Sequence, residues 1–329
     1  MPRRARPLAV VIAALCLLVT ACGDDEAPDA PVAEAATTAA AFPVTITGKL
    51  GAAEIPAEPK RIVALGSPDA DVAVALGVTP LAVPKYPYAP GRDSPWLAPE
   101  LEGADVQELD ATEPSLEAIA ALKPDVILAT TFYGLEEVYD KLAQIAPVVS
   151  YEAGSSIDSW QTQAERIGRA LGREEQAKTV VASVEDRIAK EKAAHPAFDG
   201  ATFTSSFHFA PGQVVTLNSP DDFAVKILSG LGLELSPAAD RLEGDGGAQI
   251  SLERVSDLDA DAMLMSFAED KLKTSLERSG VFRRIPAVRD GRYIALTLDA
   301  TTALRNPSVL SIPYGLDELV PPLGEALGG

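Results

Sequence analysis

The sequence predicts an α/β protein of two lobes, each with a central, mostly parallel sheet, joined by one long α-helix. One observation behind this prediction is a proline-free run, residues 158–195, in which apolar residues recur with the period of a helix. The other is a repeated segment: Ser115 opens SLEAIAALKPDVILA before this run, and Ser251 opens SLERVSDLDADAMLM after it. Similar units on both sides of a long helix favour two comparable lobes.

The proline-free run divides into two consecutive helices. Asp158 is expected to cap the first helix, which ends at Gly172 and has one apolar face formed by Trp160, Ala164, Ile167 and Leu171. The second helix runs from Glu174 to His195, where Pro196 ends it. Its length of about 30 Å is the width of a small domain, so it is long enough to join two lobes.

The first lobe is predicted to alternate strands and helices after an edge hairpin at 42–55. The further elements are a strand at 62–65, a helix at 70–76, strands at 80–83 and 125–129, helices at 117–122 and 136–145, and a strand at 147–149. Strand, helix and strand at this spacing predict a parallel sheet, whose ligand site lies at the carboxyl ends of the strands.

The second lobe repeats this alternation. Strands are predicted at 202–209, 214–217, 262–267 and 293–296, and helices at 221–231, at 252–258 and from 314 onwards. Residues 301–307 are predicted to be a loop whose one cation is Arg305. The two repeated segments align without a gap and pair Leu122 with Leu258, Asp125 with Asp261 and Leu128 with Leu264.

The N-terminus resembles a bacterial lipoprotein signal. Three arginines precede an apolar stretch, Leu8 to Val19, which is short for a membrane span, and the segment Val19-Thr20-Ala21-Cys22 ends in a cysteine. The resemblance implies that residues 1–22 are processed, that Cys22 is lipidated, and that the lipid holds the protein at the outer face of the cell membrane. A plain secretory signal is the alternative. Residues 23–41, rich in alanine, threonine, proline and acid, are expected to be a flexible tether.

Cysteine usage and charge exclude several classes of function. Cys16 lies in the signal segment and Cys22 at its end, so no thiol remains for a disulfide, a thiolate metal site or a nucleophile. Loss of Arg3, Arg4 and Arg6 changes the formal net charge from −20 to −23. Such an acidic body argues against binding to nucleic acid or to anionic lipid surfaces, so membrane attachment is expected by the lipid anchor only.

The order of several segments resembles the ferric-siderophore and cobalamin type of substrate-binding lipoprotein that serves ABC importers. The segments are PKRIVALGSPDADVAVALGV, LEAIAALKPDVILAT, KLAQIAPVV, ILSGLGLELSP, ISLERVSDLDADAMLM and FRRIPAVRDGRYIAL. The resemblance implies a first lobe at 42–157, linking helices at 158–198, a second lobe at 199–329, little hinge motion and a shallow cleft between the lobes. It also implies a monomeric binding protein without enzymatic activity or a cofactor, whose partners are an iron chelate and an ABC permease.

Candidate ligand-binding residues come from loops that follow strands. A bulky, often anionic ferric siderophore requires cations and aromatic faces. Arg92 and Arg305 are the candidate cations. The candidate aromatic residues are Tyr86, Tyr88, Trp96, Tyr133 and Phe267. His208 ends a strand of the second lobe and is a candidate for hydrogen bonding to the ligand or, as in some relatives, for ligating its metal. The alternative is a satisfied histidine of the surface or the core that takes no part in binding.

The repeated glutamates are candidates for permease docking. The resemblance implies that one glutamate per lobe engages arginines of the permease, and Glu117 and Glu253 match by position. The alternative is that each glutamate only complements the N-terminus of its helix, an effect of about 0.3–1 kcal/mol.

Other ligands and activities remain open from the sequence. Haem and cobalamin suit the same architecture, whereas a bare transition metal is disfavoured because only His195 and His208 supply imidazoles. A cell-envelope hydrolase is a different class of function. The chain has no Gly-x-Ser-x-Gly, HExxH or P-loop motif, but its many carboxylates leave a glycan hydrolase open. A scaffolding lipoprotein with an unused cleft is a third possibility.

Overall fold

Two sheets with the same strand order organise the two lobes. The computed structural model describes residues 42–86, 94–244 and 246–328, so the signal segment with Cys22, the tether, Tyr88 and Arg92 lie outside the described residues. In the first lobe the order is β5-β4-β3-β6-β7 and every pair is parallel. These strands are β3 (Ile62–Ala64), β4 (Ala82–Pro84), β5 (Gln107–Leu109), β6 (Val126–Ala129) and β7 (Val148–Ser150). A separate hairpin joins β1 (Val44–Gly48) to β2 (Gly51–Ile55), as predicted.

The second sheet has the order β11-β9-β8-β12-β13, with β10 (Glu234–Leu235) pairing with β8 off this path. Its strands are β8 (Thr202–Ala210), β9 (Gln213–Thr216), β11 (Ala248–Ser251), β12 (Ala262–Phe267) and β13 (Tyr293–Ala295). Here β9 is antiparallel to both β8 and β11, because a short turn joins β8 to β9 in place of a helical crossover. The remaining pairs are parallel, so the predicted α/β class with mostly parallel sheets is confirmed.

The repeated aspartates have equivalent roles in the two lobes. The carboxylate of Asp125, just before β6, accepts hydrogen bonds from the backbone N–H groups of Lys60 and Arg61 at 2.8 and 2.9 Å. Asp261, just before β12, accepts from the backbone N–H and the hydroxyl of Thr202 at 2.9 and 2.7 Å. Each aspartate therefore fixes the start of the central strand of its own sheet, and the sequence repeat corresponds to a structural one.

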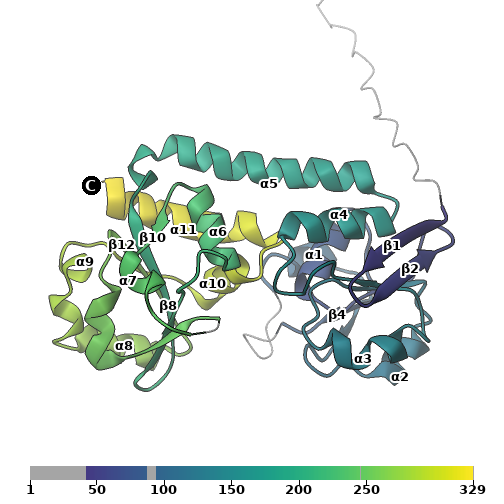
Figure 1. Cartoon of the computed structure of the whole chain (residues 1–329), viewed down its shortest axis with the longest axis horizontal. Helices are drawn as coiled ribbons and strands as arrows, with labels where there is room; N and C mark the ends of the chain where they lie inside the picture. The colour runs from purple at the N-terminus through teal and green to yellow at the C-terminus, as the bar shows by residue number, and fades with distance from the viewer. Residues whose placement is uncertain (1–41, 87–93, 245, 329) are drawn as a thin grey trace, which may run out of the picture. The chain divides into compact units, whose positions relative to one another are not determined.

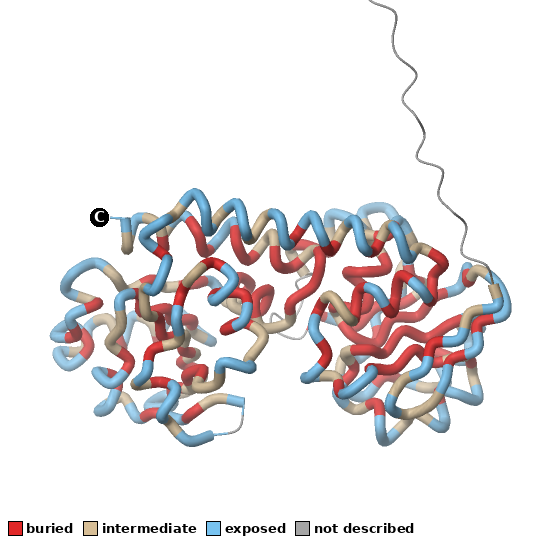
Figure 2. The backbone as a smooth tube through the Cα atoms, turned by 45° about the horizontal axis from the view of Figure 1, so that its top comes forward, coloured by how far each residue is buried: buried red, intermediate tan, exposed pale blue. Residues whose placement is uncertain are grey.

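Helices cover the sheets of the first lobe and then join the lobes. The first-lobe helices are α1 (Ser67–Ala75), α2 (Leu116–Ala121) and α3 (Leu135–Leu142), with a short 3-10 helix η1 (Ala98–Leu101). The linking helices are α4 (Trp160–Ala170) and α5 (Glu174–Ala194), followed by η2 (Pro196–Phe198). The strands β3, β6 and β7 are buried along their whole length, as Figure 2 shows for this lobe.

The linking helices form as predicted, except at the first cap. The hydroxyl of Ser159, not the carboxylate of Asp158, accepts the bond from the N–H of Thr162 at 3.1 Å. Asp158 instead accepts from the N–H groups of the preceding turn, at Glu152, Ala153 and Gly154. The prediction of an Asp158 cap was therefore wrong by one residue, because the carboxylate has three competing donors behind it.

Ion pairs fix α5 to both lobes. At its start, Arg173 bonds to Glu58 of the first lobe at 2.8 Å. Farther along, Arg187 pairs with Asp317 of helix α11 (Ser311–Gly328) at 2.8 Å, and Lys192 pairs with Asp199 at 3.3 Å. The helix is continuous over 21 residues and lies along both lobes (Figure 1).

The remaining helices belong to the second lobe, and some of them differ from prediction. They are α6 (Phe223–Gly230), α7 (Pro237–Asp240), η3 (Leu252–Leu258), α8 (Asp270–Arg278), η4 (Phe282–Arg284), α9 (Pro286–Arg289) and α10 (Leu298–Arg305). The predicted helix at 252–258 is a 3-10 helix. The predicted loop at 301–307 is largely helix α10, which begins where the hydroxyl of Thr297 accepts a bond from the N–H of Ala300 at 3.1 Å.

The close packing of α4 on α5 gives a stability prediction. A Cβ atom at Gly168 of α4 would lie 2.4 Å from the Cβ of Ala177 on α5. We expect Gly168→Ala to lower the free energy of unfolding by about 1–3 kcal/mol, because the two helices must move apart. Urea denaturation followed by circular dichroism measures this value.

Gly280→Ala is the matched control for Gly168→Ala, because nothing lies within 4 Å of a Cβ atom at Gly280. That variant should change the free energy of unfolding by no more than about 0.5 kcal/mol. Equal effects of the two substitutions would contradict the packing explanation.

Candidate functional site

A cleft of about 560 Å³ lies between the two lobes. The first lobe contributes the loops that follow β3, β4, β5, β6 and β7, and these loops lie at the carboxyl ends of parallel strands. The second lobe contributes the segment after β9, the start of α6 and the end of α10. The described residues that line the cleft are Leu65, Gly66, Ser67, Pro68, Pro84, Tyr86, Trp96, Ala111, Thr131, Phe132, Tyr133, Ser155, Ser156, Gln163, Leu217, Asn218, Ser219, Asp221, Asp222, Phe223, Gly246, Gly247, Thr302, Arg305, Asn306 and Pro307.

Asp69 fixes the floor of the cleft on the side of the first lobe. The chain order of its sheet reverses between β3 and β6, which is the position where open α/β sheets bind ligands. The Asp69 carboxylate accepts bonds from Gly66 N–H after β3 and from the N–H and hydroxyl groups of Thr130 and Thr131 after β6. Burial raises the pKa of Asp69 to about 6, although these donors oppose the shift. Both loops are thereby held in one arrangement.

Aromatic side chains form one wall of the cleft. Tyr86 and Trp96 are buried and meet edge to face, with ring centroids 5.8 Å apart. Phe132 is also buried, whereas Tyr133 beside it is 88% exposed at the cleft surface. This wall contains three of the predicted aromatic residues. Phe132 was missed, although it precedes Tyr133 in the same loop after β6.

The same aromatic residues connect the two lobes. The Trp96 indole N–H and the Ser308 hydroxyl both donate to the Oδ2 atom of Asp71, at 2.9 and 2.5 Å. The Tyr86 hydroxyl donates to Asp299 of α10 at 2.9 Å, and the ring of Tyr314 on α11 lies 5.5 Å from that of Trp96. We call this set of contacts the inter-lobe bridge. It shows that α5 is not the only connection between the lobes, in contrast to the expectation from sequence.

Arg305 is the cation that the second lobe presents to the cleft. It ends helix α10 and is half-buried, and within the described part of the chain its guanidinium has no salt-bridge partner. Two carboxylates, those of Asp221 and Asp222, line the same side. Asp222 also caps α6 by accepting from the N–H of Ala224 at 2.8 Å.

The rest of this wall was missed from the sequence. It includes Asn218, whose amide donates to the carbonyl groups of Leu242 and Gly244 at 2.8 and 3.0 Å, and the neighbouring Gly246 and Gly247. Several glycines precede β11 in the sequence, and glycine lets the backbone come close to a ligand. This cluster could therefore have predicted that the segment lines the cleft.

Comparisons with known proteins identify the family. A model of the periplasmic binding protein family matches residues 62–300. The chain belongs to this family. A probable siderophore-binding lipoprotein of Bacillus subtilis, YfiY, is 33% identical over 45% of this chain and 44% of its own length, so the chain spans less than half of that relative.

Solved structures of relatives show the same fold. A periplasmic solute binding protein from Mycobacterium smegmatis superposes with a TM-score of 0.76 at 29% identity, over 87% of this chain and 99% of the other. The iron-uptake protein PiaA of Streptococcus pneumoniae, solved in complex with ferrichrome, gives 0.71 at 25% identity, over 86% and 98%. The predicted two-lobed architecture is confirmed, and the family consists of substrate-binding proteins, not enzymes.

Two predicted ligand contacts of this periplasmic binding protein lie outside the cleft lining. His208 is 1% exposed within β8 and packs edge to face against Phe267 of β12, with ring centroids 5.9 Å apart. Burial lowers the pKa of His208, which favours the neutral imidazole. His208 is thus buried in the second lobe and absent from the cleft lining, and its role in ligand binding stays a prediction. Among the described residues, no group of three His, Cys, Asp or Glu side chains is arranged to hold a metal ion.

The repeated glutamates occupy equivalent, exposed positions in this binding protein. Glu117 lies in the first turn of α2, after the outer strand β5, and accepts a bond from the Ser115 hydroxyl at 3.1 Å. Glu253 lies in the first turn of η3, after the outer strand β11. Neither glutamate lines the cleft.

In the described chain, no helix has the length and apolar character that crossing a membrane requires.

The buried Asp71 carboxyl group of the inter-lobe bridge predicts that the stability of the fold depends on pH. Burial raises the pKa of Asp71 to about 7, compared with 3.8 for an ordinary aspartate. The folded protein therefore binds the proton of Asp71 more tightly than the unfolded chain does. The contribution of this group to stability is fully present below about pH 4 and is lost as pH rises through about 7.

We expect Asp71→Asn to remove this pH dependence, because the asparagine oxygen still accepts from Trp96 and Ser308 but does not ionise. The free energy of unfolding of the variant minus that of the natural protein should rise by roughly 2–4 kcal/mol between about pH 4 and pH 8. Urea unfolding across this range measures the difference. A difference that stays constant with pH would show that Asp71 does not titrate in this window.

Proposed function

We propose that this protein is the extracytoplasmic receptor of an ABC importer that captures a ferric siderophore in the inter-lobe cleft and delivers it to the permease. The observation that carries the proposal is the cleft itself, which both lobes line with aromatic faces on one side and the guanidinium of Arg305 on the other. Relatives that are named for siderophore binding, or solved with ferrichrome, support this ligand class.

The site is proposed to be pre-formed. The inter-lobe bridge joins the lobes through hydrogen bonds and a shared apolar cluster, which contains Tyr86 and Trp96 of the first lobe and Ala303 of the second. Changing the angle between the lobes requires breaking these buried contacts. A receptor of this kind binds with little loss of conformational freedom, which favours affinity.

The charges of the cleft favour a neutral or weakly charged chelate. Within the described residues that line it, Asp221 and Asp222 oppose the single guanidinium of Arg305. The acidic body adds a long-range repulsion for anions. In a ferric hydroxamate the hydroxamate groups neutralise the charge of the iron. Such a chelate fits the balance of charges in the cleft better than a highly anionic catecholate or citrate complex. Tyr88 and Arg92, outside the described residues, remain candidates for further contacts.

The location and domain organisation of the receptor are proposed from the sequence. The receptor is proposed to be held at the outer face of the cell membrane by lipid on Cys22, with residues 23–41 as a tether. The proposed lobes are residues 42–157 and 199–329, with linking helices at 158–198. A monomer is sufficient for binding, because one chain supplies both walls of the cleft.

Fluorescence titration of the protein with ferric chelates tests the ligand class. We expect a ferric hydroxamate to bind more tightly than ferric catecholate or ferric citrate, and Arg305→Ala to weaken hydroxamate binding by about tenfold or more. The reason is that a hydrogen bond to a charged group contributes about 1.5–3 kcal/mol. Haem and cobalamin are the comparison ligands, and saturable binding of one of these alone would contradict the siderophore assignment.

Arg278→Ala is the matched control for Arg305→Ala. Arg278 also ends a helix, α8, but it is exposed and does not line the cleft. Both substitutions remove one positive charge from a helix C-terminus, so only a contact in the cleft distinguishes them. Equal weakening by both variants would indicate a general charge effect.

Uptake of iron tests the proposed permease contact. We expect the double substitution Glu117→Lys and Glu253→Lys to abolish uptake of radioactive iron chelate in cells that carry the permease, while the dissociation constant of the purified protein is unchanged. The physical reason is that both side chains are exposed and lie outside the cleft, where reversed charge repels permease arginines.

Glu100→Lys with Asp270→Lys is the control for this double substitution. Each of these acidic residues also lies exposed in the first turn of a short helix, one in each lobe, so the net charge changes equally. Uptake that survives reversal of Glu117 and Glu253, or that is lost equally in the control, would overturn the docking proposal.

A further inference from the structure

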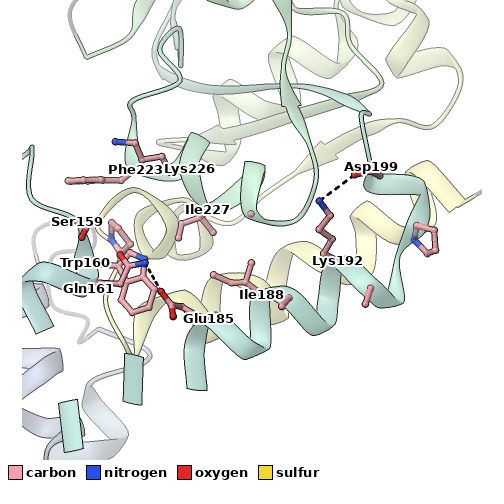
Figure 3. Close-up of a pocket in the computed structure, with 15 residues that line it drawn as sticks. Ser159, Trp160, Gln161, Glu185, Ile188, Lys192, Asp199, Phe223, Lys226 and Ile227 are labelled. Carbon is pink, nitrogen blue, oxygen red and sulfur yellow. Dashed lines mark hydrogen bonds and ion pairs between the residues drawn. The ribbon is translucent and has the colours of Figure 1, made fainter. Parts of the chain in front are cut away.

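A second, larger hollow runs along the linking helix. It has a volume of about 1150 Å³ and lies between α5 and α6, with the start of α4 at one end. Figure 3 shows Ile188 of α5 and Ile227 of α6 on its walls, Trp160 and Phe223 toward one end, and Lys192 with Asp199 toward the other. We call this hollow the α5–α6 groove. Its lining on α5 extends from Glu185 to Ala193, a rise of roughly 12 Å.

The α5–α6 groove adjoins the cleft. Phe223, the first residue of α6, and Pro307, just after α10, line both. Trp160 and Gln161 of α4 line the groove, and Gln163 of the same helix lines the cleft. The groove and the cleft therefore share two wall residues, Phe223 and Pro307.

The chemistry of the groove differs from that of the cleft. Its charged and amide side chains are paired with one another or with close neighbours. Gln161 donates to Glu185 at 3.0 Å, Lys192 pairs with Asp199 at 3.3 Å, and Lys226 pairs with Asp221 at 3.6 Å. The surface left between these pairs is apolar and comes from Trp160, Ile188, Ala189, Phe223, Ile227 and Pro307. Such a surface suits an uncharged hydrocarbon chain.

We propose that the α5–α6 groove is a subsite for an aliphatic chain, and that the natural substrate is an amphiphilic ferric siderophore whose chelating head lies in the cleft. This inference rests on the proposed function. It assigns the substrate to a class of chelates that carry an acyl tail, which passes Phe223 and Pro307 to reach the groove.

Paired chelates test the proposal. The probes are a ferric trihydroxamate and the same trihydroxamate with a medium-length acyl chain on its terminal amine. We expect the acylated chelate to bind the full chain at least about tenfold more tightly, because burial of two methylene groups suffices for that ratio.

Ala189→Trp should remove the advantage of the acylated chelate by filling the groove, without changing the affinity for the unacylated chelate. Ala189 is exposed, so the substitution does not disturb the core. Ala182→Trp is the matched control: it is an exposed alanine of α5, two helical turns earlier, and does not line the groove. The advantage should persist in that control.

The two tryptophans of the chain report on the two sites separately. Trp96 lines the cleft and Trp160 lines the groove, and the sequence contains no other tryptophan. An acyl chain with a terminal bromine quenches fluorescence at contact range. The part of the quenching that depends on bromine should disappear in Trp160→Phe, in which the remaining Trp96 still reports binding of the chelating head.

The outcomes separate this proposal from the proposed function. Equal affinity for the two chelates, or an advantage that survives Ala189→Trp, overturns the tail subsite and leaves the receptor assignment standing. Failure of both chelates, together with the other ferric complexes, overturns the receptor assignment. Bromine-dependent quenching that persists in Trp160→Phe overturns the placement of the tail in the groove.

Discussion

The carboxylate of Asp71 is the interaction on which the arrangement of the two lobes depends. It belongs to α1 of the first lobe and accepts hydrogen bonds from Trp96 of the same lobe and from Ser308, which precedes α11. The group is 1% exposed, and its Oδ1 atom has no hydrogen-bond partner among the residues that the structure describes. A buried carboxylate destabilises the fold unless hydrogen-bond donors accompany it. The side chains of Asp71, Trp96 and Ser308 must therefore keep their relative positions. The cleft inherits this rigidity because Trp96 is part of its wall.

A rigid cleft and a rigid linking helix have the same functional consequence. Binding proteins with a flexible hinge recognise a ligand by closing around it, whereas here the lobes are connected by α5 and by the inter-lobe bridge. Selectivity must then arise from the fit and charge of a fixed surface.

The features that could be predicted from sequence are those encoded locally. The periodicity of residues 174–195 fixes α5, because its apolar stripe meets one continuous core. The repeated Asp125 and Asp261 could be found because each performs the same task at the start of a central strand.

The features that were missed depend on distant contacts. Helix α10 lacks a clear aliphatic stripe because its buried face includes Asp299 and Thr302, and the partner of Asp299 is Tyr86, 213 residues away in sequence. The burial of the His208 side chain likewise depends on a distant residue, because its ring packs against Phe267 of the neighbouring strand. Arg305 was found as a candidate cation, but its position at the end of a helix was not.

The position of α11 links the folding of the two lobes. Its residue Tyr314 packs on Trp96, so the last helix of the chain completes an apolar cluster of the first lobe. At the proposed location outside the cell membrane, a chain that has crossed the membrane unfolded, N-terminus first, cannot complete its first lobe until α11 has emerged. The two halves are thus similar in architecture but mature as one cooperative unit, and a chain cut short before α11 leaves an incomplete first half open to proteolysis.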